Sequence, residues 1–248
     1  MLWNENFFDN LDVQDVDVDA EGTSITVKVP IIQRDISRLG AFLLIDAEKA
    51  QAAIPASLVP ASEYAGMPFP EGKAMLQVYV SEKRDVDGMK ELPYTEVVFS
   101  IPVLYQDQPV IYVISMPATS NEAVLGVKAL WNFPGFLVDV TKEETDDDVT
   151  DVVSADGQTI LTIKVPKGST NISEMQTDLV APGKEGGLAL VHAGMQVEMS
   201  MGQGSDALLE FGDHPFVDQL KDLDIGPVVM CFHAPRIQIW VDAAKEIS

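Results

Sequence analysis

The chain contains one cysteine and few basic residues, and each shortage excludes a class of protein. Because Cys231 is alone, an intramolecular disulfide and a cysteine-rich zinc site are both excluded. Only 16 lysine and arginine residues stand against 39 aspartate and glutamate residues, so the formal net charge is −23. A surface this acidic repels phosphate groups, and we therefore expect no nucleic-acid or membrane partner. A single cysteine also agrees with a reducing, cytoplasmic location.

Long apolar runs are absent as well. No stretch reaches the roughly 18 apolar residues of a membrane-spanning helix, and the first residues lack the pattern of a secretory signal. The length of 248 residues and the hydrophobic fraction of 46% are typical of a globular protein. No linker stands out, so the sequence predicts a single domain over residues 1–248.

Most of the chain shows the alternating pattern of short strands. In residues 23–29, for example, Ile25, Val27 and Val29 alternate with polar residues. Segments 46–54 and 120–131 each begin with a helix-capping residue and predict short helices, and 214–221 is the candidate for a short third helix. Many strands joined by short turns predict a mainly β (α+β) fold, an antiparallel β-barrel or double sheet with two or three short helices. The predicted strands are 23–29, 41–45, 75–81, 94–103, 110–115, 136–140, 159–165, 188–192, 195–201, 228–232 and 237–241.

General motif searches identify no cofactor or metal site. The histidines His192, His214 and His233 occur in neither HxH nor HExxH spacing, so we expect structural or exposed roles for them. Gly202-Gln203-Gly204 lacks the spacing of a phosphate-binding loop. The acidic run 142–151 is expected to be a solvated loop between strands.

One stretch, residues 93–140, carries more information. It contains Tyr94-Thr95-Glu96 on a predicted strand, a second strand, a helix with Gly126, and Phe133-Pro134 in a turn. Residues 42–60 and 208–227 add a strand, an Asp-initiated helix and a C-terminal hairpin in the same order. Together these motifs resemble the acetoacetate decarboxylase family. The resemblance implies a barrel of the acetoacetate decarboxylase type, a small oxo-acid ligand and assembly into a homo-oligomer.

The chemistry of this family depends on a lysine amine. The amine converts the ketone of a β-keto acid into a protonated imine, which accepts the electrons left by departing CO₂. The lysine must be neutral to attack, and acetoacetate decarboxylase itself is a known case of a lysine with a lowered pKa. In the family this lysine belongs to a pair that follows an aromatic-Pro dipeptide. Here Gly135 and Phe136 occupy the two positions.

No nearby lysine replaces the missing amine in the sequence. Lys128 and Lys142 are each seven residues from Gly135, and seven residues of helix span roughly 10 Å. We interpret Lys128 as a solvated helix residue and Lys142 as part of the acidic run. The sequence therefore predicts a family member that does not decarboxylate through a Schiff base.

Other site residues are suggested by the resemblance. Glu96 matches the pocket carboxylate of the family and is the candidate catalytic residue. The family also binds the substrate carboxylate with an arginine on an early strand, which either Arg38 or Arg34 would provide. Tyr94, Trp131, Phe133 and Pro134 complete the predicted substrate-binding set, and Arg38 is the arginine we include in it.

Three functions remain open on the sequence alone. The chain could be a divergent lyase that acts on a small oxo acid without imine chemistry. It could be a non-catalytic barrel that binds a small acid or an apolar ligand. It could also be an oligomeric structural protein with a vestigial pocket. Gly135 argues against decarboxylation and so favours the second and third functions. Glu96, by contrast, favours a pocket that still binds a ligand.

Overall fold

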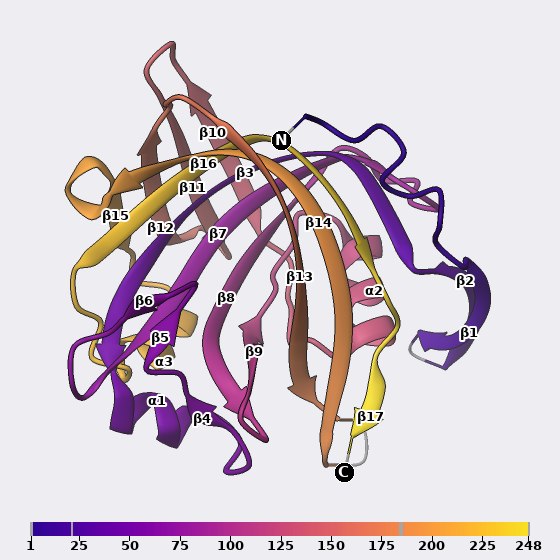
Figure 1. The fold of residues 1–248 in the computed structure, drawn as a ribbon, viewed down its shortest axis with the longest axis horizontal. Helices are drawn as coiled ribbons and strands as arrows, with labels where there is room; N and C mark the ends of the chain where they lie inside the picture. Colours follow the sequence, from indigo (N-terminus) through magenta and orange to yellow (C-terminus); the bar gives the residue numbers. More distant parts are fainter. Residues whose placement is uncertain (1, 21, 184–185, 248) are drawn as a thin grey trace.

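A barrel of seven strands forms the centre of the molecule (Figure 1). The computed structural model describes residues 2–20, 22–183 and 186–247. Neighbouring barrel strands are antiparallel except β9 and β13, which are parallel and close the barrel together with the β13–β14 pair. The predicted mainly β class is confirmed, with a barrel of mixed rather than purely antiparallel pairing. In spatial order the strands are β13 (Asn171–Pro182), β9 (Gln108–Ser115), β8 (Tyr94–Tyr105), β7 (Lys73–Val86), β3 (Ile31–Asp46), β16 (Val228–Val241) and β14 (Leu188–Gln203).

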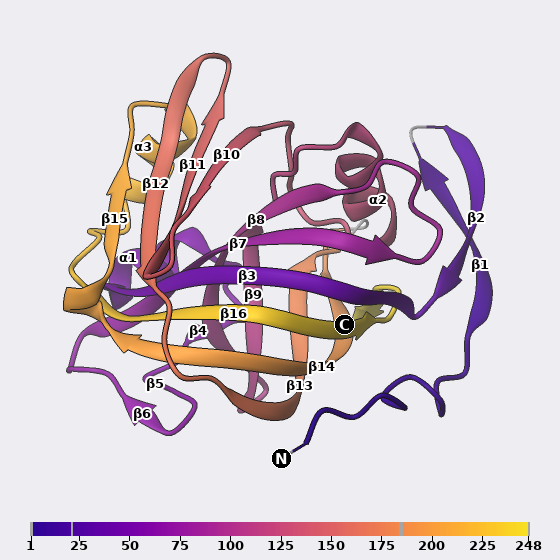
Figure 2. The same ribbon diagram turned by 90° about the horizontal axis from the view of Figure 1, so that it is seen from above.

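A second sheet covers one side of the barrel. It contains β10 (Asp139–Glu144), β11 (Asp148–Ala155), β12 (Gln158–Pro166) and β15 (Leu208–Phe211), all antiparallel. Figure 2 shows this sheet on the side opposite helix α2. The predicted solvated loop over 142–151 is wrong, because most of that run belongs to the β10–β11 hairpin. Its alternate residues Val149 and Asp151 are buried, which gives the segment the period of a half-buried strand despite its charge.

Within the described residues the three α-helices follow their predicted boundaries. Helix α1 (Ala47–Ala53) begins after Asp46, whose carboxylate accepts hydrogen bonds from two backbone N–H groups. Helix α2 (Asn121–Trp131) is capped by Ser120, and α3 (Pro215–Lys221) by His214. Each cap satisfies N–H groups that have no partner inside the helix. None of these helices has the length and apolar character needed to cross a bilayer.

Several predicted strands are fragments of longer ones. The segments 188–192 and 195–201 belong to the single strand β14, and 228–232 and 237–241 belong to β16. Strand β16 stays continuous past Pro235 because its register with β3 shifts between Ala234 and Ile237. The remaining short elements are β1 (Gln14–Ala20), β2 (Thr23–Val29), β4 (Val59–Pro60), β5 (Glu63–Tyr64), β6 (Met67–Pro68), β17 (Lys245–Ile247) and the 3₁₀ turn η1 (Gly204–Asp206).

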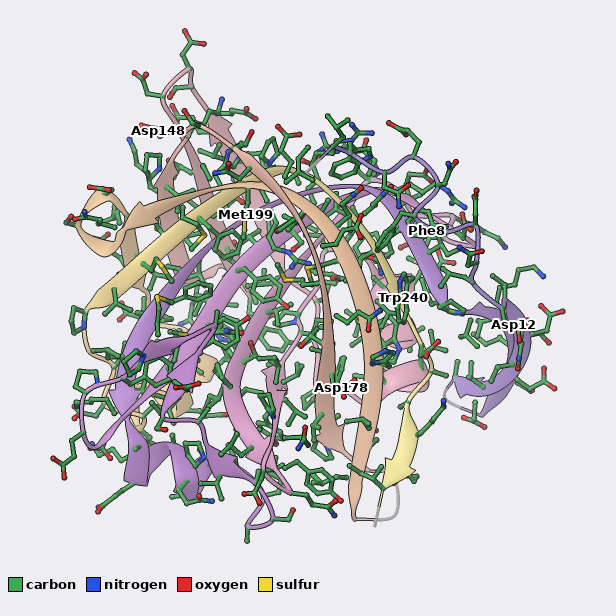
Figure 3. The ribbon with its side chains drawn as sticks, viewed as in Figure 1. Phe8, Asp12, Asp148, Asp178, Met199 and Trp240 are labelled. Carbon is green, nitrogen blue, oxygen red and sulfur yellow. The ribbon has the colours of Figure 1, made fainter. Side chains whose placement is uncertain are left out.

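The negative charge is spread over the periphery. In the view of Figure 3, the labelled Asp12 and Asp148 lie on opposite sides of the molecule, far from each other. The outside therefore carries carboxylates in several directions. Among the buried polar groups, two sets lie beside β7, around Lys83 and around Asp151, and these define the sites described below.

Candidate functional site in the barrel interior

The two faces of β7 point into different environments. Leu76, Val78 and Val80 pack in one hydrophobic cluster with Val149 and Val153 of the covering sheet, so this is the outer face of the barrel. Tyr79 belongs to a second cluster that includes residues from all seven barrel strands. Because side chains alternate along a strand, Ser81 and Lys83 share the inner face with Tyr79.

Three polar residues form a row across the inner face. Arg38 of β3 pairs with Ser81 of β7, and Ser81 pairs with Glu96 of β8. The Nε of Arg38 donates a hydrogen bond to Oγ of Ser81 at 2.7 Å, and its guanidinium lies 4.4 Å from the centre of the Tyr79 ring. Neighbouring strands are about 4.8 Å apart, so the backbones of Arg38 and Glu96 are separated by roughly 10 Å.

The adjacent row contains a buried ion pair that the sequence analysis did not identify. Nζ of Lys83 lies 3.1 Å from Oε2 of Glu96 and donates a 2.6 Å hydrogen bond to Oε1 of Gln33. The hydroxyl of Tyr94 donates to the other carboxylate oxygen of Glu96 at 3.1 Å. Lys83 is 2% exposed and Glu96 is 5% exposed. Each charged group is thus hydrogen-bonded, as buried charges must be.

Burial changes the proton affinity of these groups. It lowers the pKa of Lys83 from its ordinary value, although the carboxylate of Glu96 acts in the opposite direction. Burial also raises the pKa of Tyr94 well above its ordinary range, and the neighbouring Glu96 adds to this shift. The phenol therefore stays protonated and serves as a hydrogen-bond donor to the carboxylate.

The turn after Pro134 lies beside this cluster but offers it no side chain. Residues 116–118 pair with β8 through an Ala118–Glu96 bridge, and Ala118 also bridges to Leu137. Met116 N–H donates to the carbonyl of Pro134 at 2.6 Å. A Cβ atom at Gly135 would lie 2.6 Å from the carbonyl oxygen of Met116, which is too close for any side chain without movement of the backbone. The geometry explains why glycine occupies the position.

The other predicted site residues are divided between the interior and the surface. Phe133 is fully buried and its ring lies 6.0 Å from that of Trp131, in the hydrophobic cluster of the barrel interior. The indole N–H of Trp131 donates to the carbonyl of Asp242. Pro134 is exposed, and its carbonyl serves the backbone contact described above. Arg38, Tyr94 and Glu96 are therefore brought together, with Trp131 and Phe133 in the surrounding apolar layer.

The other basic residues considered for the site lie outside the barrel interior. Arg34 is exposed and forms an ion pair with Asp87, so of the two candidate arginines only Arg38 lies on the inner face. Lys128 is exposed on α2. Lys142 is exposed, as expected, and its ammonium lies 2.8 Å from Glu82 on the outer side of the barrel.

The histidines have mainly structural surroundings. Nδ1 of His192 contacts Asp178 at 2.5 Å, and His214 caps α3. Across the part of the chain that the structure describes, no group of three or more His, Cys, Asp or Glu side chains is placed to hold a metal ion. Lys83 is the member of the interior cluster that the sequence analysis did not identify. Its signal was the alternation Tyr79, Ser81, Lys83, which places a lysine on the same face as two polar residues.

A comparison with protein-family models matches residues 20–233 to acetoacetate decarboxylase (ADC). The chain belongs to the acetoacetate decarboxylase family. Among solved structures, the acetoacetate decarboxylase of Legionella pneumophila is 16% identical, with a TM-score of 0.64 over 88% of this chain and 87% of that one. An acetoacetate decarboxylase-like enzyme of Sphingomonas wittichii RW1 is 14% identical, with a TM-score of 0.59 over 90% and 94%.

A third relative was solved with a small oxo acid. The enduracididine biosynthesis enzyme MppR, in complex with pyruvate, is 12% identical to this chain, with a TM-score of 0.61 over 87% of this chain and 91% of that one. At these identities the acetoacetate decarboxylase fold is what is shared. A comparison with curated protein sequences finds no match.

Proposed function

We propose that this acetoacetate decarboxylase-family barrel binds a short oxo acid at the inner-face row formed by Arg38, Ser81 and Glu96. The observation that carries the proposal is the placement of a guanidinium on β3 and a carboxylate on β8, on either side of Ser81 of β7, in the barrel interior. Arg38 offers N–H donors that match a carboxylate, and Glu96 with Tyr94 offers a hydrogen-bonded acid–base group. The complex of MppR with pyruvate supports this ligand class for the fold.

Under this proposal the turn after Pro134 supplies no amine, so the chain does not form a Schiff base there. Gly135 has no nitrogen side chain, and the carbonyl of Met116 fills the space where one would begin. The proposal includes a cytoplasmic, homo-oligomeric protein that needs no cofactor or metal and has no nucleic-acid or membrane partner. A non-catalytic binding barrel and a structural oligomer remain the alternatives to a lyase.

The binding proposal is tested with pyruvate and acetoacetate on the wild type and two matched variants. Arg38→Met removes the inner guanidinium, whereas Arg34→Met removes one of the same charge from the exposed ion pair with Asp87. We expect Arg38→Met to weaken binding about tenfold or more, because hydrogen bonds to a charged group are lost, and Arg34→Met to leave it unchanged. Absence of binding to the wild type, or equal effects of the two variants, would contradict the proposal.

One observation favours a second candidate, in which Lys83 provides the amine. Lys83 lies on the inner face, its pKa is lowered by burial, and Glu96 is within proton-transfer distance. A neutral amine would attack the ketone carbon and expel water. The protonated imine would then accept the electron pair left when the bond to CO₂ breaks. This reaction needs Lys83 to leave its ion pair when the substrate binds.

Borohydride trapping separates the two candidates. The wild type is incubated with acetoacetate and sodium borohydride, and lysine peptides are mapped by mass spectrometry. If the chain only binds the acid, no lysine acquires a reduced adduct and no CO₂ is released above background. An adduct on Lys83 that disappears in Lys83→Gln and persists in Lys128→Gln would instead establish the second candidate.

A further inference from the structure

A second polar site lies on the outer side of the barrel, between β3, β7 and β16 and the covering hairpin of β10 and β11. It is a pocket of about 240 Å³. Leu39, Val80 and Val149 provide apolar walls. The polar lining includes carboxylates, cations and an imidazole. These are Glu82, Glu144, Asp151, Arg38, Arg84, Lys142 and His233, and Ser37 also lines the pocket.

The unusual member of this lining is Asp151. It is 1% exposed and stands in a row with Val149 and Val153 along the buried face of β11. Neither carboxylate oxygen has a hydrogen-bond partner, although both are buried. A buried carboxylate without a partner is costly, and native proteins rarely leave one unless a ligand, an ion or water completes it.

The cations around the pocket are already paired with other groups. Lys142 is the direct cross-strand neighbour of Asp151, yet its ammonium lies 2.8 Å from Glu82. Arg84 contacts Asp35 at 3.4 Å, and Lys167 contacts Glu144 at 2.8 Å. Burial lowers the pKa of His233, so its imidazole is uncharged at neutral pH. The Asp151 carboxylate therefore has no hydrogen-bonded cation, and Lys142 acts on it only through its charge.

We propose that this outer pocket binds a small organic cation with a planar set of N–H donors, of the guanidinium or amidinium class, through Asp151. A carboxylate with two free oxygens accepts two parallel N–H bonds from such a group. The apolar walls can contact the hydrocarbon part of the ligand. A metal ion is a poorer fit, since the described residues place no three-ligand group here. The net charge of −23 also raises the local concentration of cations.

Apart from Arg38, this site is formed by other residues than the oxo-acid site, and the proposal for it does not rest on the oxo-acid proposal. Glu82 and Arg84 point to the outer face of β7, whereas Ser81 and Lys83 point into the barrel. Arg38 lines the outer pocket as well as donating to Ser81, so it is shared by the two sites, whereas Asp151 belongs to the outer pocket and Glu96 to the interior. The inference would stand or fall without changing the outcome of the pyruvate experiments.

The test uses methylguanidinium chloride as the probe, with tetramethylammonium chloride as a cation that has no N–H donors. Both are titrated in the millimolar range at constant ionic strength. Binding is followed by calorimetry and by the carboxyl carbon shifts of labelled aspartates. We expect methylguanidinium to bind the wild type and to move the Asp151 carboxyl resonance, while tetramethylammonium does neither. Equal responses to the two cations, or no response to either, would overturn the inference.

Two variants provide the matched comparison. Asp151→Asn keeps the shape of the side chain and removes its charge, and Asp146→Asn removes one charge from the exposed turn of the same hairpin. We expect the affinity for methylguanidinium to fall about tenfold or more in Asp151→Asn and to stay unchanged in Asp146→Asn. Unchanged affinity in Asp151→Asn would overturn the inference. The carboxyl shift in the wild type decides the matter even if that variant does not fold.

Discussion

The ammonium of Lys83 and the carboxylate of Glu96 form an ion pair, 3.1 Å apart, inside the barrel. Their strands are hydrogen-bonded neighbours, and Lys83 is directly opposite Tyr94, two residues before Glu96. The pair is therefore diagonal, and the Tyr94 hydroxyl occupies the remaining side of the carboxylate. Two charges with so little contact with water depend on each other, because removing one leaves the other unpaired in a medium that solvates it poorly.

Loss of one partner of this pair should be strongly destabilising. We expect Lys83→Met to lower the free energy of unfolding by about 3–5 kcal/mol, and the double variant with Glu96→Gln to recover part of that loss. Urea unfolding of both single variants and the double variant measures the coupling. Lys28→Met, at an exposed ion pair with Asp15, is the control and should cost less than about 1 kcal/mol. Strictly additive effects at Lys83 and Glu96 would contradict the pairing.

A side chain at Gly135 should destabilise the fold. Its Cβ would approach the backbone carbonyl of Met116, so we expect Gly135→Ala to lower the free energy of unfolding by about 1–3 kcal/mol. Gly126→Ala is the matched control, since no atom lies within 4 Å of its added Cβ on α2 and alanine favours a helix. Thermal unfolding of the two variants should therefore shift in opposite directions. A Gly135→Lys variant as stable as the wild type would show that the turn can move.

Asp151 should make stability depend on pH. Burial raises its pKa from 3.8 to about 6, so the folded state favours the protonated carboxyl. The stabilising effect of that proton is complete below the unfolded pKa and is lost as the pH rises through about 6. We expect Asp151→Asn to gain stability over the wild type by about 1 kcal/mol more at pH 8 than at pH 5. The charged and titratable groups around it are Arg38 on β3, Glu82 and Arg84 on β7, Lys142 and Glu144 on β10, and His233 on β16.

Denaturant unfolding of the wild type and Asp151→Asn across this pH range measures the effect. Asp146→Asn is the control, because that residue lies in an exposed turn. An identical pH dependence in the wild type and Asp151→Asn would show that the buried carboxylate does not titrate in this range.

Local signals in the sequence were sufficient for the helices. Asp46, Ser120 and His214 are each followed by a helix that begins at the next residue, because a capping side chain acts on backbone groups only two or three positions away. The motifs around Glu96 and Phe133 were sufficient for the family. These features depend on neighbours in the chain, which a sequence displays directly.

Features that depend on register were harder to predict. Arg34 and Arg38 are four residues apart, so simple alternation places both on one face of β3. The structure separates them because the pairing of β3 with β7 shifts on both sides of Asp35. Lys83 was missed for a related reason, since its partner Glu96 follows only after β7 and β8 are aligned. In the acidic run 142–151, the many charged residues indicated a solvated loop, although every second residue from Val149 is buried as in a strand, including Asp151.

Consecutive residues of strand β7 belong to the two different sites. Glu82 belongs to the outer pocket and Lys83 to the barrel interior, so the backbone between them separates the outer pocket from the Lys83–Glu96 ion pair. Inserting or deleting a single residue near this point would turn each side chain to the opposite wall and exchange their surroundings. Evolution of this barrel can therefore vary its loops in length, but at β7 it is restricted to replacing residues one for one.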